Sequence, residues 1–133
     1  MNILQLNHVS INVKNLDSSL SFYEKVLGLK YLGVVDMGDH RLYYFRLNEF
    51  TRLELIDYDH DLNSNPNRSD SLGIYRHIAI EVDEIEKWES RIESAGIRIW
   101  SRASTVARLS AKTMLIEDPN GVEIEFLENV GSP

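Results

Sequence analysis

The chain repeats itself, and the repeat limits what it can fold into. Residues 6–17 read LNHVSINVKNLD and residues 75–86 read YRHIAIEVDEIE, so His8 aligns with His77 at an offset of 69. Later in each half, RLELID (52–57) resembles VEIEFLE (122–128), which aligns Glu54 with Glu125 at an offset of 71. Because the two offsets nearly agree at opposite ends of the repeat, we interpret the chain as two copies of one unit.

Each half has the pattern of a strand, a helix and three further strands. Residues 3–13 alternate, with His8 on the polar face, which is typical of a half-buried strand. Asp17 or Ser18 can cap the helix that follows. The remaining strands of the first half are expected at about 30–36, 41–48 and 51–58. The second half predicts a strand at 75–82, a helix at 84–95, and strands at 97–104, 111–117 and 122–128.

Local turn signals support these boundaries. Gly28 and Gly96 fit the left-handed position that follows the end of a helix. The sequence Asp-Pro-Asn-Gly at 118–121 predicts a hairpin turn, since proline presets φ and Asn-Gly tolerates positive φ. Residues 59–74 are polar and without period, so we expect a linker there that could act as a lid.

Each half supplies one histidine from its first strand and one glutamate from its last. If the first and last strands meet on the concave face of a curved sheet, two such faces would gather two imidazoles and two carboxylates. This set suits a borderline divalent ion such as Ni²⁺, Zn²⁺, Co²⁺, Mn²⁺ or Fe²⁺, with positions left open for substrate. The predicted metal ligands are His8, Glu54, His77 and Glu125.

Taken singly, these residues have simpler interpretations. A strand histidine is usually a hydrogen-bonded, half-buried residue, and a strand glutamate usually faces solvent. Only the equivalent positions in the repeat favour a shared site. The other two histidines are weaker candidates for metal ligands. His40 lies in a Gly-Asp-His turn, and His60 lies in an Asp-His-Asp sequence that is more simply interpreted as a solvated charge cluster.

Composition excludes several classes of function. The chain has no cysteine, so a thiolate metal site or a thiol nucleophile is excluded. Its net charge of −7 argues against binding a nucleic-acid backbone or an anionic membrane surface. No run approaches the roughly 20 apolar residues of a membrane span, and the N-terminus does not resemble a signal peptide. We therefore expect a cytoplasmic protein whose partner is a small molecule.

Four segments together resemble one family. They are NHVSINVKNLDSSLSFYEKVLGL, LELID, RHIAIEVDEI and EDPNGVEIEFLE, within about residues 4–128. The chain resembles the vicinal oxygen chelate superfamily, also called the glyoxalase/bleomycin-resistance/dioxygenase superfamily. The resemblance implies an α+β fold, with two βαβββ modules forming a cupped mixed sheet and a metal on its concave face. It implies a single domain over 1–133, with modules at about 3–58 and 75–128, and a homodimer, since modules often pair across subunits.

The resemblance also implies an activity. In the glyoxalase-like branch the ligands are His, Glu, His and Glu, which match all four residues here. We therefore expect a metal-dependent lyase or isomerase that acts through an enediolate on a small substrate with vicinal oxygens. By resemblance Glu125 is the catalytic base and Glu54 its counterpart across the metal.

Two alternatives stay open. An Fe²⁺ extradiol dioxygenase would use His8, His77 and Glu125, and would leave Glu54 a bystander. A protein that binds a drug or metabolite without chemistry would need no intact ligand set.

Some positions depart from the glutathione-using glyoxalases. Those enzymes tend to have an arginine where this chain has Asn12, an asparagine near the position of Tyr58, and a glycine-rich segment where this chain has ASTVARLSAKT (103–113). These departures argue against specificity for a glutathione hemithioacetal. Four arginines could serve a different anionic substrate, although surface charge is the commoner role for each: Arg46, Arg52, Arg102 and Arg108.

Overall fold

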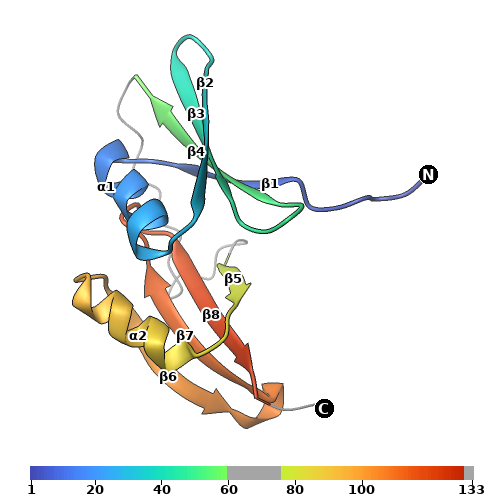
Figure 1. Cartoon of the computed structure of the whole chain (residues 1–133), viewed down its shortest axis with the longest axis vertical. Helices are drawn as coiled ribbons and strands as arrows, with labels where there is room; N and C mark the ends of the chain where they lie inside the picture. The colour runs from blue at the N-terminus through green and yellow to red at the C-terminus, as the bar shows by residue number, and fades with distance from the viewer. Residues whose placement is uncertain (60–75, 131–133) are drawn as a thin grey trace. The chain divides into compact units, whose positions relative to one another are not determined.

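The chain forms two compact units, each built around its own four-stranded sheet (Figure 1). The computed structural model describes residues 1–59 and 76–130. The predicted linker therefore lies outside the described residues except for Asp59, and so does His60. The prediction that the two units make one domain stays a prediction.

The first unit has the strand order β1-β4-β3-β2. Strand β1 runs parallel to β4, whereas β4, β3 and β2 pair as antiparallel neighbours. Between β1 and β2 the chain forms a short α-helix, α1, which continues as a π-helical turn, η1. The bounds are β1 His8–Asn12, α1 Leu16–Ser21, η1 Phe22–Val26, β2 Lys30–Asp36, β3 His40–Arg46 and β4 Arg52–Tyr58.

The second unit has the same topology, with the strand order β5-β8-β7-β6. Strand β5 is parallel to β8, and the other neighbours are antiparallel. The bounds are β5 Ile78–Glu81, α2 Ile85–Ser94, β6 Ile99–Val106, the 3₁₀ turn η2 Ala107–Leu109, β7 Ala111–Glu117 and β8 Glu123–Asn129. The predicted α+β fold of two βαβββ units is confirmed.

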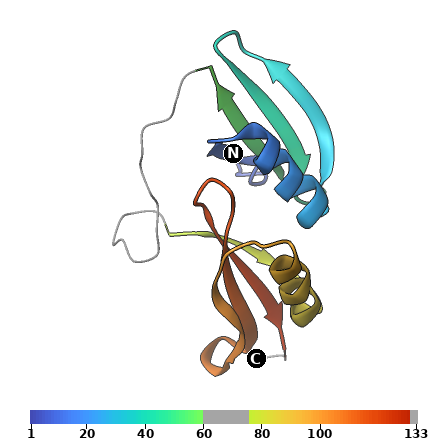
Figure 2. The same cartoon turned by 90° about the vertical axis from the view of Figure 1, so that its left-hand side faces the viewer.

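One face of each sheet packs against the helix of its own unit (Figure 2). In the first unit the ring of Tyr23 contacts Phe45 of β3, and in the second Trp88 of α2 contacts Phe126 of β8. The buried side chains include Leu53, Leu55, Ile92, Met114 and Ile116. Because side chains alternate along a strand, the polar residues between these positions lie on the opposite face.

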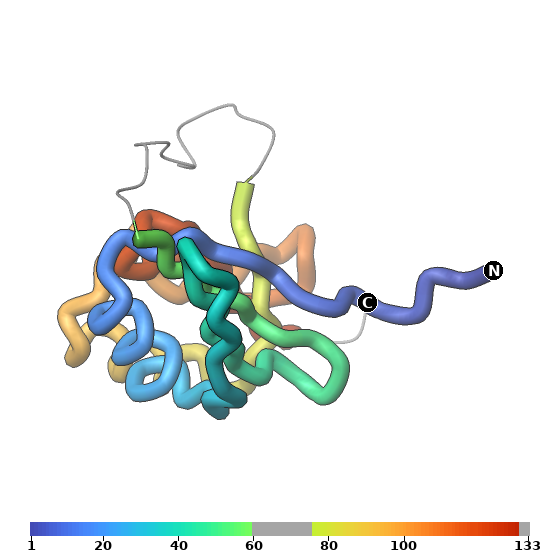
Figure 3. The backbone as a smooth tube through the Cα atoms, turned by 90° about the horizontal axis from the view of Figure 1, so that it is seen from above, coloured from blue at the N-terminus to red at the C-terminus, as the bar shows by residue number. Residues whose placement is uncertain are grey.

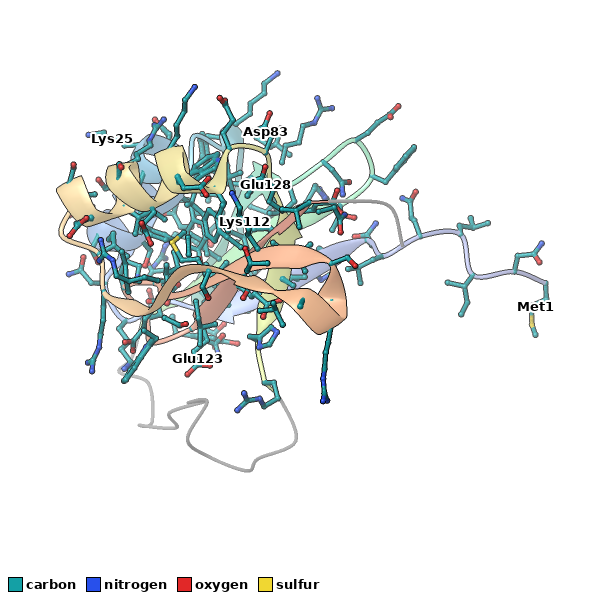
Figure 4. All side chains as sticks on the ribbon, turned by 90° about the horizontal axis from the view of Figure 1, so that it is seen from below. Met1, Lys25, Asp83, Lys112, Glu123 and Glu128 are labelled. Carbon is teal, nitrogen blue, oxygen red and sulfur yellow. The ribbon has the colours of Figure 1, made fainter. Side chains whose placement is uncertain are left out.

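Figure 4 shows this alternation in the second unit. Glu128 and Lys112 lie on the side of the sheet that carries α2, and Glu123 lies on the other side. An oxygen of Glu128 accepts a hydrogen bond of 2.9 Å from the backbone N–H of Ile85, the first residue of α2. This contact caps the helix, since Glu84 before it adopts a left-handed φ of 49° and supplies no side-chain cap.

The cap of α1 differs from the prediction. Asn15, and neither Asp17 nor Ser18, is the N-cap residue, and its side chain accepts a hydrogen bond from the backbone N–H of Ser18. Asp17 and Ser18 already lie within the first turn, where their own N–H groups need acceptors. The sequence has three cap-forming residues within four positions, so the pattern alone could not choose between them.

The glycine and turn predictions are confirmed. Gly28 and Gly96 both have a φ of 71° directly after the helix ends. In the β7–β8 hairpin, Asp118 accepts backbone hydrogen bonds from Asn120 and Val122, and Gly121 has a φ of 88°. This turn sets the register that places Glu125.

The first strand is shorter than predicted. It begins at His8 because the preceding residues have little to pair with: Ile3 and Leu4 are almost fully exposed, and residues 1–6 run away from the sheet (Figure 3). At six and ten residues, α1 and α2 are also too short to cross a membrane, and the described residues hold no longer α-helix.

Candidate functional site

The first unit brings His8 and Glu54 together on the face opposite α1. Parallel pairing of β1 with β4 sets Ser10 beside Glu54, and His8 lies two residues earlier on the same face. The imidazole Nε2 of His8 lies 4.0 Å from Oε1 of Glu54. Glu54 is 7% exposed, whereas His8 lies on an edge strand and is exposed.

The second unit repeats this arrangement with His77 and Glu125. Pairing of β5 with β8 sets Ala79 beside Glu125, and His77 lies two residues before Ala79. Nε2 of His77 lies 3.7 Å from Oε2 of Glu125, and both side chains are half-buried. The alignment by offset therefore corresponds to one geometry, built twice.

In each pair the histidine and the glutamate are spaced better for binding a common metal ion than for a direct hydrogen bond. Distances of 3.7 and 4.0 Å are too long for hydrogen bonds. Two donors bonded to one ion at about 2.0–2.2 Å lie roughly 3.0–3.5 Å apart, so small side-chain movements suffice. His8 has Nδ1 within 2.8 Å of the Asn7 side-chain oxygen, which leaves Nε2 as the ligand atom when Nδ1 carries the proton.

The two ring nitrogens of His77 have different surroundings. Its Nδ1 is buried and has no hydrogen-bond partner among the described residues. Nδ1 is the ring nitrogen that does not face Glu125, so the case for a metal rests on Nε2 and the Glu125 carboxylate and not on this atom. The imidazole and carboxylate donors, with no thiolate among them, suit a borderline divalent ion.

Glu54 is fixed by two hydroxyl groups. Ser10 donates a hydrogen bond of 2.8 Å to Oε1, and Tyr44 of the neighbouring strand β3 donates one of 2.5 Å to Oε2. Each carboxylate oxygen keeps a further lone pair, which could bind a metal. We call this arrangement of Ser10, Tyr44 and Glu54 the hydroxyl clamp.

The clamp also determines the charge of the carboxylate. Burial alone would raise the pKa of Glu54, but the hydrogen bonds from Tyr44 and Ser10 act in the opposite direction. With the nearby charges of His8 and Arg52, they hold the pKa of Glu54 below its ordinary value. The same hydrogen bond raises the pKa of Tyr44, so the phenol keeps its proton and remains the donor.

Glu125 has no such clamp. The residues at the equivalent register positions are Ala79 and Leu115, which have no hydroxyl groups. No hydrogen bond to the Glu125 carboxylate forms within residues 76–130. The two carboxylates of the repeat therefore differ in freedom: Glu54 is held at both oxygens, and Glu125 is not.

Within each unit the structure gathers one histidine and one glutamate, but no group of three or more possible ligands forms among residues 1–59 and 76–130. The four-ligand site thus stays a prediction. The sequence pattern did not identify Ser10 and Tyr44 as partners of Glu54. Strand alternation could have indicated Ser10, but Tyr44 depends on the β3–β4 register, which the sequence does not reveal.

The weaker sequence candidates take other roles. His40 contacts Asp39 at 2.6 Å and packs against the ring of Tyr58. Asp59 pairs with Arg41 at 2.6 Å. Arg102 is held by Glu89 and Glu93 across the surface of the second unit, which is the surface role expected for it.

The chain is similar to known proteins over nearly its whole length. Residues 5–126 match the Glyoxalase/Bleomycin resistance protein/Dioxygenase superfamily. A lactoylglutathione lyase of Neisseria meningitidis serogroup A is 31% identical over 127 residues, covering 94% of this chain and 91% of that protein. The chain therefore belongs to the glyoxalase/bleomycin resistance protein/dioxygenase superfamily, as its sequence motifs predicted.

Solved structures show the same fold. A glyoxalase family protein from Bacillus cereus has a TM-score of 0.83 at 21% identity, covering 98% of this chain and 97% of that one. An antibiotic binding protein from a Streptomyces species has a TM-score of 0.75 at 17% identity, covering 97% and 98%. At these identities the likeness concerns the fold alone. The similarity to lactoylglutathione lyases supports a glyoxalase-like function with a small-molecule substrate.

Proposed function

We propose that this chain is a metal-dependent lyase or isomerase of glyoxalase type. The observation that carries the proposal is the repeated His–Glu pair, His8 with Glu54 and His77 with Glu125, in one geometry on two sheets. These four side chains would together hold one divalent ion, among Ni²⁺, Zn²⁺, Co²⁺, Mn²⁺ and Fe²⁺. The similarity to lactoylglutathione lyases supports the same class of reaction.

In the proposed reaction Glu54 and Glu125 have different roles. When bound, the ion would polarise a substrate carbonyl and stabilise the charge of an enediolate. Glu54, clamped by Tyr44 and Ser10, stays ionised and in place. Glu125 has no hydrogen bond to break, so it can take a proton from one carbon and return it to the neighbouring carbon.

The dioxygenase alternative is less well supported. A three-ligand Fe²⁺ site would use His8, His77 and Glu125, and Glu54 would have no task. Yet Glu54 is buried, held ionised and close to His8. Burying an ionised carboxylate costs desolvation free energy, and a role as metal ligand would explain why the protein keeps it there. The clamp therefore favours four ligands over three.

The binding-protein alternative rests on the likeness in fold to an antibiotic binding protein. A protein that only sequesters a ligand needs no proton acceptor and no matched ligand set. The repeated His–Glu pairs therefore favour an enzyme.

The test combines metal content with turnover. The full chain is purified without added metal, its metal is measured, and each ion is then tested with methylglyoxal and a panel of thiols that includes glutathione. We expect about one ion per chain and formation of a 2-hydroxyacyl thioester. Uptake of O₂ with catechols by the iron form would instead assign the protein to the dioxygenases, and no turnover on either panel with a ligand bound would favour the binding protein.

We also propose a homodimer, since modules of this superfamily pair, often across subunits. Sedimentation of the metal-loaded protein at micromolar concentration tests this. A species of monomer mass alone would refute it and leave only pairing within one chain.

A further inference from the structure

Two arginines lie directly opposite each other on the face of the first sheet that carries the hydroxyl clamp. In the antiparallel pairing of β3 with β4, Arg46 is the partner of Arg52, and Tyr44 is the partner of Glu54. Residues two apart on a strand share a face, so both arginines lie on the face of Tyr44 and Glu54. Both are exposed.

Among the described residues, no carboxylate lies within ion-pair distance of either arginine, and Glu54 is the one acidic group on which Arg52 acts at longer range. Within residues 1–59 neither guanidinium forms an ion pair, whereas nearby Arg41 is paired with Asp57 and Asp59. Like charges directly opposite each other in a sheet are destabilising. In a chain with 21 acidic residues and a net charge of −7, two neighbouring arginines without an ion pair among the described residues are suited to bind an anion.

Arg52 also contacts the hydroxyl clamp. Its guanidinium carbon lies 4.4 Å from the centre of the Tyr44 ring, a cation–π contact. The hydroxyl of that same ring donates to Glu54. Arg52, Tyr44 and Glu54 therefore form one continuous row of contacts across the two strands.

The repeat itself does not require arginines here. In the second unit the same register positions hold Glu117 and Glu123, which pair across β7 and β8. Glu117 accepts a hydrogen bond of 3.2 Å from Nε1 of Trp100. At these register positions the described residues therefore have an exposed arginine pair in the first unit and a glutamate pair in the second, of which Glu123 is buried.

We propose that Arg46 and Arg52 form an anion-binding subsite that holds a carboxylate or phosphate group of the substrate. Guanidinium forks bind either group through two parallel hydrogen bonds. Arg52 lies two residues from Glu54, or about 7 Å along the strand, so the anionic group belongs several bonds away from the reacting carbons. The assignment of this anion to the substrate rests on the proposed function, whereas the anion site itself does not.

Direct binding is the first test. The full chain is titrated with succinate, inorganic phosphate and the neutral succinamide, and backbone and guanidinium NMR signals are followed. We expect shifts centred on Arg46 and Arg52 with succinate or phosphate, and none with succinamide. The stronger of the two anions identifies the group as carboxylate or phosphate.

Variants make this test specific. Arg46→Gln and Arg52→Gln should each weaken anion binding at least fivefold, with an unchanged or higher melting temperature because a like-charge contact is removed. Arg108→Gln is the matched control, since it removes the same charge from an exposed arginine of the second unit that has no ion pair in the described residues. Wild-type affinity in Arg52→Gln, or an equal loss in Arg108→Gln, would overturn the proposal.

Kinetics then separate the subsite from the reaction. The hemithioacetals of methylglyoxal with 3-mercaptopropionate and with 2-mercaptoethanol differ in one anionic group. In Arg46→Gln, which changes a residue with no ion pair or ring contact to Tyr44 or Glu54 in the described part of the chain, we expect KM to rise about tenfold for the acid adduct, with kcat preserved and no change for the neutral adduct. An equal rise for both adducts would overturn the subsite. If the wild type turns over neither adduct, the lyase proposal fails and the titration still decides the anion site.

Discussion

The hydroxyl oxygen of Tyr44 lies 2.5 Å from a carboxylate oxygen of Glu54, across two paired strands. At the equivalent place in the second unit, Leu115 is the partner of Glu125. One carboxylate is therefore fixed and held ionised, and its counterpart has no hydroxyl donor. This difference matches the two roles that we propose for these residues, Glu54 as a fixed metal ligand and Glu125 as the base.

Tyr44→Phe should weaken metal binding without unfolding the protein. The substitution removes one of the two hydrogen bonds that orient Glu54 and lower its pKa. Groups that orient a metal ligand typically contribute about 10–100-fold to affinity. We therefore expect at least about a tenfold rise in the Kd for Zn²⁺ or Ni²⁺, measured by isothermal titration.

Tyr43→Phe is the control for that experiment. Tyr43 is the neighbouring residue of β3, so its side chain lies on the opposite face from Glu54. Its hydroxyl can be removed without touching the clamp. Equal metal affinity in both tyrosine variants would show that the clamp does not support the metal site.

Transferring the clamp to the second unit should slow the reaction. Ala79→Ser combined with Leu115→Tyr would place hydroxyl groups beside Glu125, at the positions that Ser10 and Tyr44 have beside Glu54. A carboxylate held at both oxygens is a weaker and less mobile base, so kcat should fall about tenfold or more while metal affinity stays equal or improves.

The matched control is Ala79→Ser with Leu115→Phe, which adds the ring without its hydroxyl. If both double variants lose the same activity, the ring and not the hydrogen bond would be responsible. Wild-type kcat in the Tyr-containing variant would mean that Glu125 need not move.

The sequence predicted the fold because its signals are local and occur twice. Alternation predicted the strands, Gly28 and Gly96 marked the helix ends, and the Asp-Pro-Asn-Gly turn fixed one hairpin. The cap of α2 could not be predicted in this way. Glu128 reaches Ile85 across 43 residues, and such a contact depends on how a strand end meets a helix start.

The site could be predicted only as far as the repeat extends. His8, Glu54, His77 and Glu125 stand out because they align between the halves. Ser10 and Tyr44 matter for the opposite reason, because the second half has Ala79 and Leu115 in their places. Aligning the two halves finds only residues that are the same in both, so it does not find Ser10 and Tyr44. The strand register is needed to see that they lie beside Glu54.

Removing the cap of α2 should lower stability without affecting the site. Glu128→Ala deletes the acceptor of the Ile85 N–H, and the loss of a helix cap typically costs about 1 kcal/mol. For a chain of this length that corresponds to a fall in Tm of about 3–6 °C. Thermal unfolding followed by circular dichroism measures it.

Glu128→Gln and Glu81→Ala are the controls for this measurement. The amide oxygen of Gln can still accept the hydrogen bond, so its loss should be smaller. Glu81 is an exposed residue of β5 with no ion pair in the described residues, so its removal should change little. A larger loss in Glu81→Ala than in Glu128→Ala would contradict the capping role.

Glu125→Gln should abolish turnover while keeping much of the metal. An amide oxygen can still coordinate weakly, but an amide cannot accept a proton at neutral pH. Loss of a general base typically costs about 10²–10⁴ in rate. His8→Ala and His77→Ala should instead lose metal and activity together, because each removes an imidazole ligand. The measurement is a metal titration of each variant beside its kcat.

The possible outcomes show which part of the proposal is wrong, the base or the metal ligands. Wild-type kcat in Glu125→Gln would transfer the role of base to Glu54 or to a hydroxide on the metal. Wild-type metal binding in all three variants would mean that the ion is held elsewhere, and the Asp-His-Asp sequence at 59–61 would then be the next candidate. Loss of metal from only one of the two histidine variants would mean that one unit holds the ion alone. The proposed four-ligand site predicts that both variants lose the ion, because each substitution would remove one of its two imidazole ligands.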